Sequence, residues 1–130
     1  MASRAKTPAP TDAELDLLRV LWKRGPSTVR EVFDSVVRSK GTGYTTVLKQ
    51  MQVMRKKGLV RRSERFRAHV YEPAEAKTDT QRRLARGLLE RAFGGSAKGL
   101  LQSALAGRTL DEQELAEIRT LLAEIEGGGR

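Results

Sequence analysis

Basic side chains are concentrated in the middle of the chain, in the stretch KGTGYTTVLKQMQVMRKKGLVRRSERFR of residues 40–67. Nine lysines and arginines stand there against one acid, Glu64, and the whole chain carries a net charge of +9. Within this stretch, Thr45, Thr46 and Lys49 place hydroxyl and amine groups at helical spacing. Such groups form hydrogen bonds with base edges and phosphates. These residue types therefore favour the binding of a polyanion.

Residues for catalysis or metal binding are scarce. The chain has no cysteine, which excludes disulfides and thiolate metal sites, and His69 is its only histidine. No glycine-rich phosphate loop follows a predicted strand, no acidic pair recurs at metal-ligand spacing, and no serine has a base to activate it. We expect no enzymatic activity, no metal and no cofactor, and we expect His69 to pack or bond locally on a strand.

The helix expected over residues 44–57 has two distinct faces. A helical wheel places on one face the apolar set Tyr44, Val47, Leu48, Met51 and Met54. The opposite face carries Thr45, Thr46, Lys49, Val53 and Lys56. A helix that buries one face and exposes hydroxyls and a lysine on the other can enter a DNA major groove. Gly58 is expected to end it.

A hairpin is expected directly after this helix. Residues 59–62 and 68–72 have strand character, and the polar residues 63–67 separate them. A helix followed by a basic hairpin is typical of a winged helix-turn-helix, in which the wing reaches neighbouring phosphates. The predicted DNA contacts are Thr45, Thr46, Lys49, Val53, Lys56, Lys57, Arg62, Arg65 and Arg67. The alternative is a solvated basic helix with a surface hairpin.

Two earlier helices must position the basic helix. Thr11 and Glu14 have capping-box spacing and begin a helix that Gly25 and Pro26 end. A second helix opens at Ser27 or Thr28 and runs to about residue 38, before the glycine-containing loop 40–43. Residues 1–10 are expected to be a disordered tail. Residues 11–73 are therefore predicted to form one winged-helix domain of three helices and a hairpin.

Residues 74–126 are predicted to form a separate three-helix domain, followed by a frayed tail at 127–130. Residues 76–130 hold nine basic and eight acidic side chains, so the charge excess has ended. Thr78, Ser96 and Asp111 are expected to cap the three helices, and Gly94-Gly95 to break the first. Their apolar positions include Leu84, Leu88, Phe93, Leu101, Leu105, Leu115, Ile118, Leu122 and Ile125.

These leucines exceed what about 50 residues can cover by themselves. We expect a second copy of the same helices to cover them in a homodimer, and the alternative is an intramolecular three-helix core. The fold class is thus α+β and mostly α. No apolar run approaches the roughly 20 residues of a membrane span, and the N-terminal residues lack a signal-peptide core, so we expect a cytoplasmic protein without membrane insertion.

Several segments resemble one known family. PTDAELDLLRVLW, GPSTVREV, GYTTVLKQMQVM, KGLVRR and AHVYEP are similar to the DNA-binding domain of the penicillinase-repressor (BlaI/MecI/CopY) family of bacterial transcriptional repressors. QRRLARGLLERAFGGSAKGLLQSAL and ELAEIRTLLAEI resemble its dimerisation region. The resemblance implies a homodimer that represses promoters by binding two-fold symmetric double-stranded operators. It also implies that Thr45, Thr46 and Lys49 face the groove.

The sequence departs from this family in three places. Many members have a basic residue where this chain has Val53, so we expect its base preference to differ from theirs. One hypothesis is that the methyl groups of Val53 contact a thymine methyl group. Copper-responsive members use C-terminal cysteines, which are absent here. In β-lactam-responsive members a membrane sensor protease leads indirectly to cleavage of an Asn-Phe bond, whereas the aligned residues here are Ser103 and Ala104. Induction through such a protease therefore stays open.

The leading hypothesis is a dimeric DNA-binding repressor of a palindromic operator. It rests on the local charge, the two-faced helix 44–57 and the apolar C-terminal helices. The alternative is a winged-helix interaction module that docks on an acidic protein partner.

Overall fold

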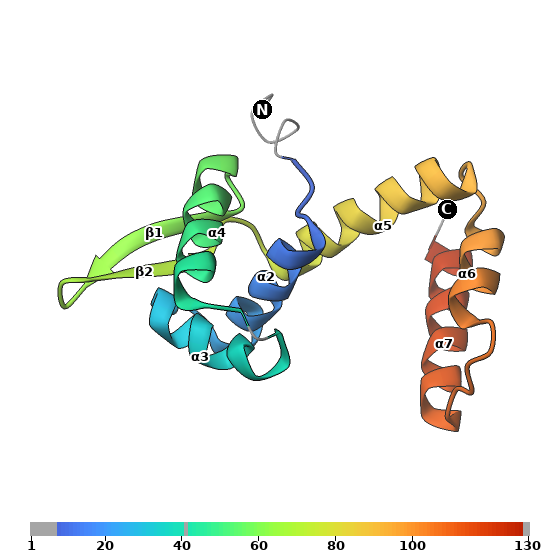
Figure 1. Cartoon of the computed structure of the whole chain (residues 1–130). Helices are drawn as coiled ribbons and strands as arrows, with labels where there is room; N and C mark the ends of the chain where they lie inside the picture. Colours follow the sequence, from blue (N-terminus) through green and yellow to red (C-terminus); the bar gives the residue numbers. More distant parts are fainter. Residues whose placement is uncertain (1–7, 41, 129–130) are drawn as a thin grey trace. The chain divides into compact units, whose positions relative to one another are not determined.

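The computed structural model describes residues 8–40 and 42–128, apart from the side chains of residues 37–40. Most of the expected disordered tail and the last two residues lie outside this range. The chain forms two compact units that divide within one helix, between Arg86 and Gly87. The predicted class, mostly helical with an N-terminal winged helix and three C-terminal helices, is confirmed (Figure 1). The domain boundary expected at residues 73 and 74 stays a prediction.

The first unit contains α2 (Asp12–Arg24), α3 (Val29–Lys40), α4 (Tyr44–Lys57), β1 (Val60–Arg65) and β2 (Ala68–Pro73). The capping box expected at Thr11 and Glu14 is present, and a second one forms at the start of α3. The Thr11 hydroxyl accepts from the Glu14 N–H at 3.2 Å, and the Glu14 carboxylate accepts from the Thr11 N–H at 2.9 Å. Thr28 and Glu31 exchange the same two bonds at 3.1 and 2.9 Å. Each cap contributes about 1 kcal/mol and fixes where its helix begins.

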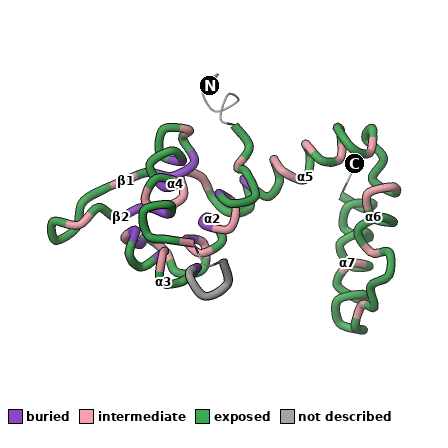
Figure 2. Tube along the Cα trace, in the orientation of Figure 1, coloured by how far each residue is buried: buried purple, intermediate pink, exposed green. Residues whose placement is uncertain are grey.

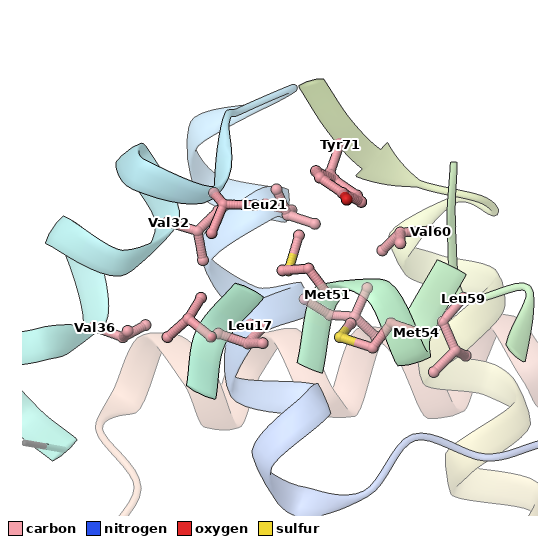
Figure 3. Close-up of a cluster of buried hydrophobic side chains, with 12 residues drawn as sticks. Leu17, Leu21, Val32, Val36, Met51, Met54, Leu59, Val60 and Tyr71 are labelled. Atoms are coloured by element: carbon pink, nitrogen blue, oxygen red, sulfur yellow. The ribbon is translucent and has the colours of Figure 1, made fainter. Parts of the chain in front are cut away.

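One apolar core holds these elements together. Side chains from α2, α3, α4 and the hairpin converge on it, and Val47, Met51 and Met54 of α4 are fully buried (Figure 3). The inward face predicted for α4 is confirmed at these three positions, and Leu48 is half-buried beside them. The opposite face of α4 is therefore directed away from the core.

The inward placement predicted for Tyr44 is wrong. Tyr44 opens α4 and remains 39% exposed. Its ring packs edge-on against Phe33 with centroids 5.6 Å apart, and the Arg30 guanidinium lies within 6 Å of both rings. Tyr44 is the first residue of α4 and packs on Phe33 at the edge of the core, so periodicity alone assigned it to the wrong environment.

The hairpin is longer and tighter than predicted. Strands β1 and β2 pair antiparallel from Val60 opposite Pro73 to Arg65 opposite Ala68, which leaves a two-residue turn. The expected loop over 63–67 is wrong at its first three positions, which continue β1. A wing strand exposed on both faces has no apolar alternation to reveal it. A further bridge, in which Ser27 and Tyr71 exchange N–H···O bonds of 2.9 and 2.7 Å, ties β2 to the start of α3.

Three helices complete the chain: α5 (Lys77–Phe93), α6 (Ala97–Leu105) and α7 (Glu112–Gly128). The expected caps at Ser96 and Asp111 are confirmed, accepting from main-chain N–H groups at 2.9 and 2.7 Å. The expected cap at Thr78 is wrong, because α5 already begins at Lys77. Helix α7 also continues through Gly128, into the expected frayed tail. Along α6 and α7 no described residue is buried (Figure 2).

Candidate nucleic-acid interface

The outward face of α4 gathers most of the predicted base-contacting residues. Thr45, Thr46, Lys49 and Val53 are all exposed. Together with Gln50, they line a shallow depression of about 330 Å³ between α4 and the beginning of α2. Hydroxyl, ammonium and methyl groups thus lie next to one another on a surface that a DNA groove can contact.

A second depression joins this helical face to the wing. It has a volume of about 350 Å³ and is lined by Lys49, Gln52, Val53, Arg55, Lys56 and Arg62. Lys49 and Val53 belong to both depressions, so α4 and β1 present one continuous surface. Hereafter this surface, with the exposed wing residues Arg65 and Arg67, is called the basic face.

Gln50, Gln52 and Arg55 are residues of this surface that sequence reasoning missed. Gln52 follows Lys49 by three positions, which is the spacing of neighbours on one helical face. Its primary amide can donate to and accept from adenine in the major groove. The spacing was therefore a sufficient signal for Gln52, whereas a search centred on charges and hydroxyls passed over it.

The arginines of the wing differ in their partners. Arg61 lies 3.5 Å from Glu72, and Glu64 lies 3.9 Å from the ring nitrogen Nε2 of His69. The two acidic side chains of the wing, Glu64 and Glu72, therefore each lie beside an imidazole or guanidinium group on the opposite strand. In contrast, Arg62, Arg65 and Arg67 form no ion pair with any described residue. Their charges are available to phosphates.

Lys57 occupies a different environment from the other predicted contacts. Its Nζ lies 2.8 and 3.0 Å from the two carboxylate oxygens of Glu14, which is only 5% exposed. Burial by itself would raise the pKa of Glu14, but hydrogen bonds from Lys57 and Thr11 and the lysine's charge outweigh it and hold that pKa below its ordinary value of 4.5. Lys57 thus fastens α4 to α2, and its contact with DNA stays a prediction.

Glu14 itself was missed as a residue that positions the interface. It precedes Leu17, Leu18 and Leu21 at intervals of three, four and seven residues, so it lies on the buried face of α2. A carboxylate on such a face requires a cation, and that requirement was the available signal.

The nine predicted dimerisation residues are distributed over both units. Leu84 belongs to the first unit, where it lines a depression of about 500 Å³ with Trp22 and Lys77 among others. The remaining eight belong to the second unit. Leu88, Leu101, Leu115, Leu122 and Ile125 are exposed there, and Phe93, Leu105 and Ile118 are half-buried. Leu121, on the same helix as Leu122 and Ile125, is also exposed.

Neither a metal site nor a membrane-spanning helix is found among the described residues. No group of three or more histidine, cysteine, aspartate or glutamate side chains there could hold a metal ion. No described helix combines the length and apolar composition needed to cross a bilayer.

The family model described as penicillinase repressor matches residues 10–124. The chain belongs to the penicillinase-repressor family. This repressor is accordingly a DNA-binding regulator of transcription and not an enzyme. The resemblance noted in the sequence is thereby confirmed over both units.

Characterised relatives extend over nearly the whole repressor. It is 32% identical over 121 residues to the transcriptional regulator BlaI of Mycobacterium tuberculosis, covering 90% of this chain and 85% of that protein. It is 24% identical over 119 residues to the penicillinase repressor of Bacillus licheniformis, covering 92% and 93% respectively.

Solved structures support the same assignment for the first unit. The DNA-binding domain of the repressor BlaI is 27% identical and superposes with a TM-score of 0.51, covering 57% of this chain and 90% of that domain. The Bacillus licheniformis BlaI monomer, solved in complex with the blaP half-operator, gives the same identity, coverage and TM-score.

Proposed function

We propose that this repressor binds a two-fold symmetric operator as a homodimer, with α4 in the major groove and the wing along the phosphate backbone. The continuity of the basic face from Thr45 on α4 to Arg62 on β1 supports this most directly. Thr45, Thr46 and Lys49 would contact base edges, and Val53 a thymine methyl group. The basic residues Lys56, Arg62, Arg65 and Arg67 would contact phosphates.

A relative supports the symmetric operator. The Bacillus licheniformis BlaI was solved as a monomer on a half-operator, and a half-operator contains one of two recognition sites. Two copies of this chain, joined through the exposed leucines of the second unit, would place two α4 helices about 34 Å apart, one turn of DNA. We place the repressor in the cytoplasm, where it can reach bacterial promoters.

Salt dependence of DNA affinity tests this proposal. Binding sites are first selected from a random DNA pool, and the affinity for the best duplex is then measured by fluorescence anisotropy at several salt concentrations. Phosphate contacts release counterions, so with roughly six to ten such contacts the affinity should fall about 10³- to 10⁵-fold between roughly 50 and 200 mM salt. A flat response would contradict the proposal.

Competition by random duplex is the matched control. Random DNA should displace the selected duplex only at a large excess, because it keeps the phosphate contacts and loses the base contacts. Equal competition would favour the alternative of a winged-helix module with an acidic protein partner.

A further inference from the structure

Phe66 stands out on the wing because almost none of its side chain is buried. It is 94% exposed, which makes it the most exposed large apolar residue in the described part of the chain. Burial of an aromatic ring is one of the larger favourable contributions to folding or binding. Since the fold gains nothing from this ring, an external partner is the remaining way in which it can be buried.

The backbone at the wing tip is also unusual. Phe66 and Arg67 form the two-residue turn between β1 and β2, and their φ angles are +52° and +68°. Positive φ at both positions matches a type I′ turn, which favours Asn-Gly and disfavours a bulky side chain. Strain of this kind is often found at functional sites.

The charge around Phe66 indicates which partner fits. Arg65 and Arg67 flank it, and neither forms an ion pair with a described residue. An apolar protein pocket would have to desolvate both guanidinium groups without compensation. The DNA minor groove combines negative potential with apolar sugar edges, and proteins insert phenylalanine there as a wedge between base pairs.

We propose that Phe66 inserts into the minor groove next to each half-operator, with Arg65 and Arg67 on the phosphates at either side. A two-residue turn is the narrowest hairpin end, and the groove is about 6 Å wide. The inserted ring partly unstacks one base step, so the repressor prefers a flexible pyrimidine–purine step at that position. This inference rests on the proposed binding of α4 and the wing to an operator.

The test uses the full-length repressor and the duplex selected from the random pool, with 2-aminopurine placed at the step facing the wing. Wild-type protein should increase the 2-aminopurine fluorescence, which reports unstacking. Phe66→Ala should abolish the increase and weaken binding about tenfold, because only part of the ring's transfer free energy is recovered in a groove. Phe66→Leu should retain most of the fluorescence increase and most of the affinity, since leucine can also insert as a wedge.

Two controls separate the ring from the turn. Ser63→Ala, on the adjoining strand β1, should leave affinity and fluorescence unchanged. Phe66→Gly suits the positive φ but has no ring, so it should lose affinity as Phe66→Ala does. If glycine restored wild-type binding, the backbone and not the ring would be responsible, and the wedge would be refuted.

The remaining outcomes distinguish this inference from the proposed function. If the wild type prefers the selected duplex and Phe66→Ala equals it in affinity and fluorescence, the wedge is wrong and operator binding stands. If the wild type binds selected and random duplexes equally, the proposed function fails and the wedge fails with it.

Discussion

Glu14 has two structural functions at the scale of a single side chain. It closes the capping box that begins α2, and its carboxylate pairs with Lys57 at the end of α4. The basic face depends on the position of α4, so this pair helps to hold that face in place. Replacing Lys57 would leave a buried carboxylate without its main cationic partner.

We therefore predict that Lys57→Met destabilises the fold by about 1–3 kcal/mol, the usual cost of removing a partner from a buried polar group. Urea unfolding followed by circular dichroism measures the change. Lys56→Met is the matched control, because Lys56 is its exposed neighbour on the same helix. Equal effects of the two substitutions would show that the ion pair contributes nothing.

The same carboxylate predicts how stability depends on pH. Its pKa is lower in the folded protein than its ordinary value of 4.5. The stability that ionised Glu14 contributes to the fold is therefore fully present above pH 4.5 and is lost as the pH falls through the pKa of the folded protein. Between pH 7 and 3 the free energy of unfolding should decline less in Glu14→Gln than in the wild type, which urea titrations at each pH would measure. Parallel declines would contradict this assignment.

Residues on the basic face should divide into two classes. Lys49→Ala should cost about 1–3 kcal/mol and change which duplexes are selected, because we propose that Lys49 contacts base edges. Arg65→Ala should weaken binding to all duplexes alike and reduce the salt slope by about 1, because the proposed contact of Arg65 is with phosphate. Affinities for selected and random duplexes at several salt concentrations separate these effects. Identical behaviour of both variants would refute the division.

At the scale of elements, the helix starts and the presence of the wing hairpin were largely predictable, whereas the full length of β1 was not. Thr11, Thr28, Ser96 and Asp111 cap their helices because a side-chain oxygen three residues before a free N–H is a local feature. The helix cap predicted at Thr78 is wrong because α5 begins one residue earlier, at Lys77. Near this helix start, the Thr80 hydroxyl donates a hydrogen bond to the Glu75 carboxylate at 2.8 Å. The length of β1 is determined by hydrogen bonding to β2, and the polar sequence of residues 63–65 gives no pattern from which that pairing could be predicted.

The turn of the wing gives a prediction of its own. Replacing Phe66-Arg67 by Asn-Gly should stabilise the hairpin by roughly 1 kcal/mol, because both residues adopt positive φ more readily. Hydrogen exchange of the amides of β1 and β2 should slow about fivefold as a result. The core amides of α4 serve as the internal control. Unchanged exchange in the wing would mean that the positive φ angles carry no strain.

At the scale of the whole molecule, the two units differ in how they bury apolar surface. The first has a core to which α2, α3, α4 and the hairpin contribute. The second, from Gly87 onward, exposes leucines on all three of its helices. The sequence predicted these apolar stripes from their spacing. It could not identify what covers them, because that depends on surfaces outside one folded chain.

A second copy of this chain would bury these leucines and would also account for the binding of a two-fold symmetric operator. Substitution of Ile125 provides a sensitive test. This side chain is 61% exposed, so glutamate there disturbs little within one chain. We predict that Ile125→Glu gives monomers at micromolar concentration in sedimentation velocity, because it places a charge in an apolar interface. Thr120→Glu, an exposed position on the same helix, should leave the dimer intact.

DNA binding should then change in a characteristic way. Linking two half-site contacts raises affinity by about 10²- to 10⁴-fold over one contact, so Ile125→Glu should lose most of that gain on a symmetric duplex. Its affinity for a single half-site should equal that of the wild type, since α4 and the wing are unaltered. A variant that stayed dimeric, or that bound the symmetric duplex as monomers with full affinity, would show that the exposed leucines do not couple the two recognition helices.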